Sequence, residues 1–470
     1  MVLSFDIKPL LTVEGGGDMS DKQTVSTNCL TFPDFDIRFT ERDLTANGGT
    51  VLLRKFVDAI GLRSAYLDWN IPLPGSGRGY DPMQLIEQFI VSVWTGAEHF
   101  THCEQVRNDK ALAKIFGWEK QAEHKAIQRL FKKIDNPAKS INIAKSIYRF
   151  CLGKIPFQGL TLDFDSTVIT RYGDQEGSAL GYNPRAHGRH SHHPLIAFLG
   201  SIRLIANFWL RSGNSGADNN FKNFLPDTLD NFREGQVSAV RADSGFWCKE
   251  NIDILNKKGL SYAISVKLKE SVKKAIIFSQ TPWKEIKPGL EIKDFLYTSA
   301  TWTEPQRMIA VRRHKSLGED VIGKQLNLFD NEDFNEEWKY SVITTNIPFE
   351  DVEIWRFYRQ RANCENQIKE LKADFGLDHF VMNRFWATEI ALIFCTLAYN
   401  LMSMFKLLAI RSKIFPTRST LYRHFFSVPG VWQKSKDSEN KPILWLSIHN
   451  KLRKSFVSMW ENIGTQVIPD

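Results

Sequence analysis

Two strand-like runs, each ending on an aspartate, constrain the fold of this chain more than any other feature. In GLTLDFDST the apolar residues Leu160, Leu162 and Phe164 alternate with polar ones, and Asp165 falls where the run ends. QVSAVRADSGFW reads as a second, buried strand that ends at Asp243. Ligands of α/β sheets collect at the carboxyl ends of strands, so these carboxylates can meet there although they are 78 positions apart. An isolated acid after a strand is also a common turn former or helix N-cap, and that alternative stays open for both.

A third acid lies on a predicted helix, between cationic groups. The stretch YRQRANCENQIKELK carries Tyr358, Arg361, Glu365 and Lys372, separated by three, four and seven positions. On a helix of 3.6 residues per turn, these steps place all four side chains on one face. The carboxylate suits a metal-binding acid, and the cations suit phosphate oxygens. The alternative is a solvated helix face held by salt bridges.

Three stretches resemble the motif regions of one family. They are DFDSTV with the following residues 172–198, then VRADSGFW, and YRQRANCENQIKELK. Together they resemble the group-1 DDE transposases of bacterial insertion sequences, in the family numbered 1380, whose YREK signature matches the helical quartet. The resemblance covers residues 159–405, whereas the parts before and after match only in general character.

The resemblance implies an RNase H-like catalytic core whose three acids are Asp165, Asp243 and Glu365. Asp165 is preferred as the first acid because the family places it in an Asp-x-Thr setting, which the residues after Asp165 satisfy. Asp163 lies two residues earlier on the same strand face and is a lower-ranked candidate metal ligand.

Three carboxylates suit phosphodiester chemistry on two Mg²⁺ or Mn²⁺ ions, which lie about 3.5–4 Å apart in such sites. The resemblance implies that the chain binds the terminal inverted repeats of its insertion sequence, cleaves the DNA and joins the freed 3′-OH to target DNA. Tyr358, Arg361 and Lys372 would bind phosphates near the transposon end. A homodimer is expected by analogy with the symmetry of paired ends. Two alternatives remain: an RNase H-like nuclease that hydrolyses without joining, and a non-catalytic DNA-binding descendant.

The chain is expected to be α/β and to fold in four parts. Residues 1–150 read as a helical region for DNA binding or dimerisation, with a plain packing bundle as the alternative. Residues 151–268 and 340–405 form the RNase H-like core, and a mostly β insertion at 269–339 interrupts it. Residues 406–470 form a helical C-terminal region.

Charge, cysteine usage and apolar patterning favour a DNA-associated protein of the cytoplasm, and the resemblance implies a bacterial one. Residues 406–470 hold eleven Lys or Arg against four Asp or Glu, out of a net charge of +8 for the chain, which favours a polyanionic partner. The cysteines form no CxxC pair, and the N-terminus lacks a secretory signal. The most apolar stretch, Ala391 to Phe405, is about fifteen residues long and too short to span a bilayer, so it predicts a buried core helix without a membrane.

Four histidines after the first acid, His187, His190, His192 and His193, raise a zinc hypothesis. No cysteine or acid pairs with them at the spacing of a closed site, so DNA contact or packing is favoured. The aromatic residues near the motifs are expected in the core, although one could stack on a flipped base. They are Tyr182, Phe246, Trp247 and Trp386.

Overall fold

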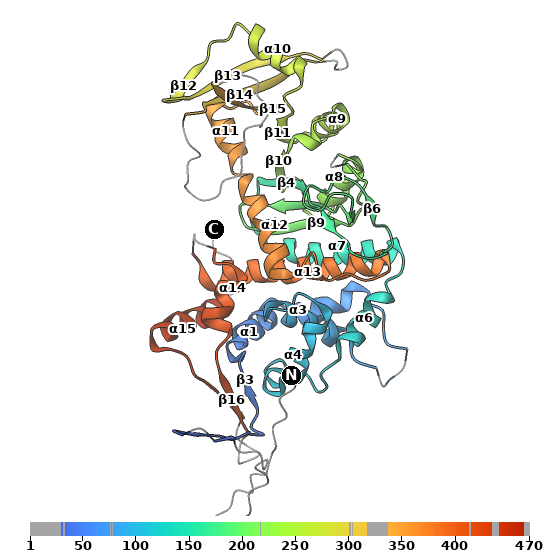
Figure 1. Cartoon of the computed structure of the whole chain (residues 1–470), viewed down its shortest axis with the longest axis vertical. Coiled ribbons are helices and arrows are strands. Elements are labelled where there is room, and N and C mark those ends of the chain that lie inside the picture. The colour runs from blue at the N-terminus through green and yellow to red at the C-terminus, as the bar shows by residue number, and fades with distance from the viewer. Residues whose placement is uncertain are drawn as a thin grey trace, which may run out of the picture.

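Figure 1 shows the computed structural model of the chain, an elongated molecule with the N-terminal helices at one end and the insertion at the other. It describes residues 30–464 except 32, 76, 78, 217, 300, 301, 303, 317–336, 413, 414 and 435–440. Expectations for residues 1–29, for 317–336 within the insertion and for 465–470 of the basic region therefore lie outside the described residues.

A sheet of nine strands runs through the molecule in the order β12-β13-β14-β15-β11-β10-β4-β8-β9. Its last five strands form the core. β4 (Leu160–Ser166), β10 (Val237–Ala242) and β11 (Ser261–Val266) are parallel, whereas β8 (Leu195–Leu199) runs antiparallel to both of its neighbours, β4 and β9 (Leu204–Trp209). Helices α8 (Phe221–Leu229) and α9 (Lys249–Lys257) provide the crossover before and after β10. This order and mixture of directions is the RNase H-like arrangement, so the predicted α/β fold class is confirmed.

The insertion extends the same sheet beyond β11. β15 (Trp338–Thr345) pairs with β11, and β14 (Gln306–His314), β13 (Leu290–Tyr297) and β12 (Lys284–Lys287) follow, all antiparallel. Side chains alternate between its two faces, where α10 (Glu270–Phe278) and α11 (Asp351–Arg359) each cover a separate small apolar cluster. The strands expected in this region are therefore present, and they lengthen the core sheet instead of forming a separate one.

Helices fill the N-terminal part of the described chain. The longer ones are α1 (Val51–Ala59), α3 (Pro82–Trp94), α6 (His124–Lys132) and α7 (Pro137–Gly153). The Asp81 carboxylate accepts a hydrogen bond from the Met83 N–H, so α3 begins as the sequence predicts. Shorter elements are β1 (Leu30–Thr31), β2 (Asp36–Ile37), η1 (Gly48–Thr50), α2 (Leu62–Ala65), η2 (Tyr66–Trp69), η3 (Phe100–His102), α4 (Cys103–Asn108) and α5 (Lys110–Phe116).

Helix α13 (Phe385–Phe405) lies between the helical part and the core sheet (Figure 1). It contacts α3, α6, α7 and β9, and the Trp94 indole donates a 2.9 Å hydrogen bond to the Ala398 carbonyl. A helix that is apolar on all sides is one buried on all sides, so the expected core helix is confirmed. Its predicted length was wrong. With η5 (Lys406–Ile410) it spans 26 residues, long enough to cross a membrane by length and composition, and 94% of its most apolar window is buried inside the protein.

The C-terminal region mixes helices and strands, where a helical region was expected. β16 (Gly430–Gln433) pairs with β17 (Ile443–Leu446) and also with β3 (Leu44–Thr45) from the other end of the chain. α15 (Asn450–Gly464) packs on α1 and η5. The remaining elements are α14 (Arg418–Leu421) and η6 (Tyr422–Phe426). One apolar core connects the helical part, the core sheet and this region, so the boundaries of the four parts stay a prediction.

Candidate active site

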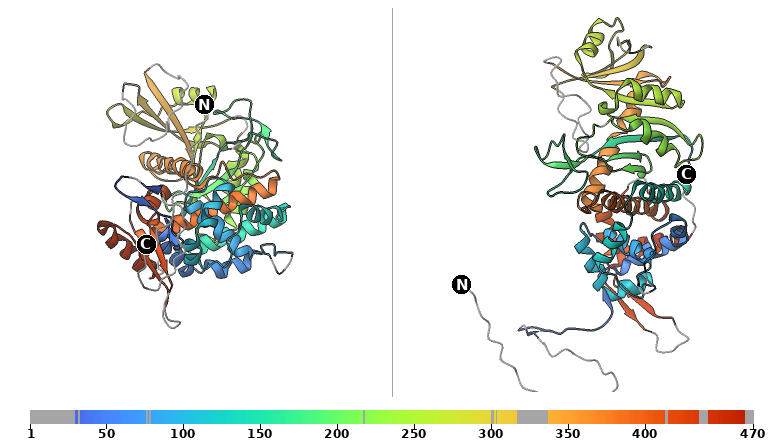
Figure 2. Two further views of the ribbon diagram at one scale, coloured as in Figure 1. Left: turned by 60° about the horizontal axis from the view of Figure 1, so that its bottom comes forward. Right: turned by 90° about the vertical axis from the view of Figure 1, so that its right-hand side faces the viewer.

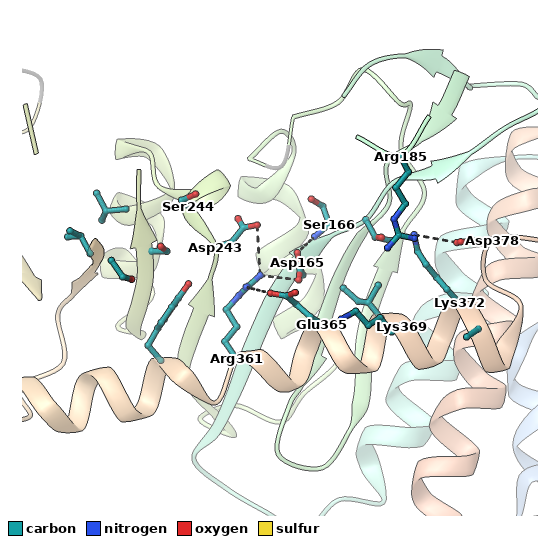
Figure 3. Close-up of a pocket in the computed structure, with 18 of the residues that line it drawn as sticks. Asp165, Ser166, Arg185, Asp243, Ser244, Arg361, Glu365, Lys369, Lys372 and Asp378 are labelled. Atoms are coloured by element: carbon teal, nitrogen blue, oxygen red, sulfur yellow. Dashed lines mark hydrogen bonds and ion pairs between the residues drawn. The ribbon is translucent and has the colours of Figure 1, made fainter. Parts of the chain in front are cut away.

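Three elements bring the predicted acids to one cleft (Figure 3). β4 and β10 are parallel neighbours with Phe164 opposite Ala242, so Asp165 and Asp243, one residue further along each, emerge side by side. Glu365 lies in the first turn of α12 (Ala362–Phe375), which passes along the same opening. The cleft has a volume of about 660 Å³. Strand register thus explains how acids from distant parts of the sequence converge.

The helix that carries the quartet is broken, whereas a continuous one was expected. α11 (Asp351–Arg359) and α12 are separate, and at the break the Arg361 N–H donates to the Tyr358 carbonyl at 3.0 Å, one residue closer than in an α-helix. The Phe357 carbonyl, the α-helical acceptor for Arg361, instead accepts a 2.7 Å hydrogen bond from Arg241 Nη1. All four residues of the quartet nevertheless line the cleft, so the expected shared face is present.

The Arg361 guanidinium lies among the three carboxylates (Figure 3). Its Nη2 is 3.0 Å from Asp165 Oδ2 and 3.9 Å from Asp243 Oδ2, and its Nη1 is 3.9 Å from Glu365 Oε1. The side chain is only 7% exposed. Arg361 therefore acts as the counter-ion of the acids in this structure, and its expected binding to a phosphate stays a prediction.

The cleft makes its acids hold protons more tightly than in water. Burial raises the pKa of Asp165 to about 7; Arg361 opposes this rise, and the charges of Asp243 and Glu365 add to it. Burial also raises the pKa of Glu365. A cation among these groups would favour their charged forms, because opposite charge stabilises a carboxylate.

Each strand-end aspartate has one oxygen in a local hydrogen bond and the other toward Arg361. Asp165 Oδ1 accepts from the Ser166 N–H at 2.8 Å, and Asp243 Oδ1 accepts from the Gly245 N–H at 2.9 Å. Asp243 thereby caps the short helix η4 (Ser244–Phe246), so the N-cap alternative holds for this one oxygen. The capping and cleft roles are compatible because a carboxylate has two oxygens.

The donor set of the cleft fits a hard divalent cation, because it consists of carboxylate oxygens. Within the described part of the chain, no three His, Cys, Asp or Glu side chains are already arranged to hold a metal ion. At this site the reason is the guanidinium, which stands where the three carboxylates converge. Metal binding would require the side chains of Arg361 and the acids to rearrange.

Asp163 is placed away from the cleft lining. It is completely buried, and its two oxygens accept from Arg241 Nε at 2.6 Å and Arg241 Nη2 at 2.9 Å. Gly200 passes so close that an added Cβ would lie 2.3 Å from Asp163 Oδ2. Both oxygens of Asp163 are thus bound by Arg241 in this structure, and its lower-ranked role as a metal ligand stays a prediction.

The two remaining quartet residues are partly engaged with the protein. The Tyr358 hydroxyl is 3.4 Å from the Ala242 carbonyl, and burial raises the pKa of this phenol to about 12. Lys372 Nζ donates to the Val168 carbonyl at 2.7 Å and lies 3.5 Å from Asp378, and burial lowers its pKa. Their phosphate contacts stay predictions.

Sequence reasoning missed two cations that line the same cleft, Lys369 and Arg185. Lys369 could have been found, because it follows Glu365 by one helical turn. Arg185 lies in the motif stretch 172–198 but far in sequence from the three candidate acids, and only the fold brings it over α12 (Figure 3).

The four histidines do not gather at one point. His192 and His193 are buried, whereas His187 and His190 are exposed. His192 Nδ1 accepts from Arg171 Nε at 2.9 Å, and burial lowers the pKa of this imidazole to about 4. His193 Nδ1 is 2.8 Å from the Ser215 carbonyl. The buried pair therefore serves packing near the first acid, one of the two roles favoured from the sequence.

The aromatic residues near the motifs differ in burial. Phe246 is fully buried as expected, and Trp247 and Trp386 are partly buried. Tyr182 is 74% exposed, so its expected place in the core was wrong.

Fold and cleft together define a protein with an RNase H-like sheet and an acidic site at the carboxyl ends of its central strands. The family model described as "Transposase DDE domain group 1" matches residues 31–428, so the chain belongs to this family. It is a DDE transposase.

Two solved structures are similar to this chain at low identity. A piggyBac transposase synaptic complex with hairpin DNA has a TM-score of 0.41 and 10% identity, and the match covers 81% of this chain and 80% of that one. A Mos1 transposase paired-end complex with the left transposon end has a TM-score of 0.17 and 11% identity, covering 43% and 64%. No curated protein matches the sequence.

Proposed function

We propose that this transposase binds the terminal inverted repeats of an insertion sequence, cleaves the DNA there and joins the freed 3′-OH to target DNA. The observation that carries the proposal is the convergence of Asp165, Asp243 and Glu365 around one guanidinium. The Tyr358, Arg361, Glu365 and Lys372 spacing further supports membership of the insertion-sequence family numbered 1380.

In this proposal the three acids hold two Mg²⁺ or Mn²⁺ ions. Such ions lower the pKa of an attacking water and stabilise the leaving 3′-oxygen. The chain's own part is to supply ionised oxygens. Because burial raises the pKa of Asp165 to about 7, this carboxyl must lose a proton before it can act as a ligand.

Cations on the rim of the cleft are suited to hold the DNA backbone. Lys369, Lys372 and Arg185 line the opening together with the acids. Their charges would bind phosphates on either side of the cleaved bond and fix the register of the strand, without reading base sequence. Double-stranded DNA is thus the proposed partner, and two copies of the chain would act on the paired ends.

Substitution of each acid tests the proposal. We expect Asp165→Asn, Asp243→Asn and Glu365→Gln to abolish cleavage of end DNA while leaving its binding intact. Glu353→Gln, an exposed acid on α11, is the matched control and should cleave normally. Normal cleavage by one of the three variants would remove that residue from the site.

A joining assay separates the proposed function from its alternatives. Transfer of a cut end into a second duplex supports a transposase, whereas cleavage without transfer would indicate a nuclease. Binding without cleavage by the wild-type protein in Mg²⁺ and in Mn²⁺ would indicate a non-catalytic descendant.

A further inference from the structure

A small three-stranded sheet projects beside the cleft. It spans residues 169–193, between β4 and β8, and consists of β5 (Ile169–Thr170), β7 (His190–His192) and β6 (Ala179–Leu180) in that order. We call residues 169–193 the arm. It stands out from the side of the core in the right-hand view of Figure 2, and its Arg185 reaches the cleft in Figure 3.

The arm is firmly fixed to the cleft wall. Arg171 Nη1 donates to the Asp378 carbonyl at 2.9 Å, and Asp378 lines the cleft. Glu176 binds the start of α13 twice: its N–H donates to the Asn383 carbonyl, and its carboxylate accepts from the Phe385 N–H at 3.0 Å. These hydrogen bonds fix the position of the arm relative to the cleft, and with it the position of the arm's exposed side chains.

The outer surface of the arm exposes aromatic rings that no packing requires. Tyr172 is 82% exposed and Tyr182 is 74% exposed. The guanidinium carbon of Arg189 lies 5.9 Å from the centre of the Tyr172 ring, within reach of a cation–π contact. Large exposed apolar groups on a fixed scaffold are typical of binding surfaces.

The charge of this surface suits a polyanion. The two acids of the arm, Asp174 and Glu176, both precede Gly177, and from Gly177 to His193 the sequence holds no Asp or Glu. Arg185, Arg189, His187 and His190 are all exposed in this segment. Cations interleaved with exposed aromatic rings are the pattern that holds single strands of nucleic acid, since phosphates meet the charges and bases stack on the rings.

We propose that the arm binds unpaired nucleotides of the DNA strand whose phosphate lies in the cleft, with bases stacked on Tyr172 and Tyr182. Arg185 links the two places, because it belongs to the arm and lines the cleft. Stacking needs a base face that is free, which bases inside a duplex do not offer. The proposal rests on the proposed function in taking the cleft as the place of the reacting phosphate.

Fluorescence of 2-aminopurine tests the proposal without catalysis. The probe is placed in a short unpaired tail at a duplex end, and the full-length protein is titrated in EDTA. We expect wild-type protein to quench the probe, and Tyr172→Ala and Tyr182→Ala to weaken tail binding about tenfold or more each. Fully paired DNA should bind within about twofold of wild type in both variants.

Matched variants make the result specific. Tyr172→Phe and Tyr182→Phe retain the ring and should bind the tail as the wild type does. Phe278→Ala removes a ring that is 73% exposed on α10, in the insertion, and should change nothing. All these side chains are exposed, so circular dichroism and melting should match wild type.

Three outcomes would overturn the proposal. Unchanged tail binding in both alanine variants would mean that the arm does not bind the unpaired DNA strand. The exposed surface of the arm would then be a candidate binding site for a protein partner. Equal weakening for tailed and paired DNA would indicate backbone contact instead of stacking. Loss in the phenylalanine variants would assign the effect to the hydroxyls. Absence of cleavage by the wild type, with normal tail binding, would instead refute the proposed function alone.

Discussion

Two aspartates on one strand, two residues apart, each face a buried arginine, yet the two pairs are built differently. Asp163 and Arg241 form a closed pair with two short hydrogen bonds, and Arg241 has further partners in the Phe357 carbonyl and Gln360. Asp165 shares Arg361 with Asp243 and Glu365 at longer distances, and Arg361 Nε has no hydrogen-bond partner among the described residues.

The difference shows that two pairs of the same residue types can have different roles, depending on how completely their hydrogen bonds are satisfied. A buried ion pair whose hydrogen bonds are all satisfied can fix the local conformation of the chain. Here Arg241 also binds the Phe357 carbonyl at the break between α11 and α12, next to Arg361 and Glu365. An incompletely satisfied cluster is costly to keep, and such clusters are typical of sites where a ligand completes the charge balance. We therefore expect the closed pair to have a structural role, whereas the open cluster is the proposed active site.

The largest expected effect is on the free energy of unfolding, which should depend more on the Asp163–Arg241 pair than on the Asp165–Arg361 pair. Asp163→Ala leaves Arg241 buried without its counter-ion, which we expect to lower the free energy of unfolding by about 3–5 kcal/mol. At pH values above about 7, Asp165→Asn leaves Arg361 the carboxylates of Asp243 and Glu365, so its unfolding free energy should fall by less than that of Asp163→Ala. Urea denaturation in EDTA measures both. An equal loss of stability in the two variants would contradict the distinction between the two pairs. The double variant Asp163→Leu with Arg241→Met should recover part of the stability that Asp163→Ala loses.

The second expected effect is a dependence of folding stability on pH, caused by Asp165. The pKa of Asp165 is about 7 in the folded protein and close to 4 when unfolded, so folding takes up a proton between these values. The stability from this group is present below about pH 4 and is lost as the pH rises through 7, by at most about 1.4 kcal/mol per pH unit.

In metal-free denaturation, the difference in unfolding free energy between wild type and Asp165→Asn should therefore fall across pH 4 to 7. Glu353→Gln should keep the wild-type profile. A pH-independent difference between wild type and Asp165→Asn would show that Asp165 titrates at an ordinary value.

The smallest expected effect tests whether Arg361 competes with metal. Removing the guanidinium in Arg361→Gln leaves three acids without a resident cation, so Mn²⁺ affinity should rise about tenfold, or about 1.4 kcal/mol. The increase in melting temperature on adding Mn²⁺ should exceed that of wild type. Arg356→Gln, an exposed arginine on α11, is the control. An Mn²⁺ shift no larger than wild type would mean that Arg361 does not occupy the metal position.

Much of the fold could be predicted because its signals are local. The alternation in β4, the cap at Asp81 and the uniform apolar surface of α13 each lie within a few turns of chain. The acids Asp165, Asp243 and Glu365 could be chosen for the same reason, as two strand ends and a helical spacing. The apolar stretch taken from the sequence fell short of the whole helix because charged side chains near its ends, Glu389 and Lys406, are satisfied by Ser140 and Glu370, which the local sequence cannot show.

Other features depend on partners far away in sequence. At the break before α12, Arg241 binds the Phe357 carbonyl in place of the Arg361 N–H. Arg241 lies far away in sequence, so the sequence of the helix itself does not predict the break. The strand β16 pairs with β3, from the other end of the chain, in addition to its neighbour β17. Tyr182 resembles a core residue by type, and only the position of the arm leaves it exposed.

By itself the sequence determined the alternation of residues within the strands, the place of each candidate acid and the cations of the helical quartet, since these depend on periodicity and spacing. The tertiary structure decided which aspartate is closed off by an arginine and which remains at the cleft. The physical reason is that burial and charge pairing depend on what packs against a side chain, and for Asp163 and Asp165 those neighbours come from β10 and the α11–α12 break.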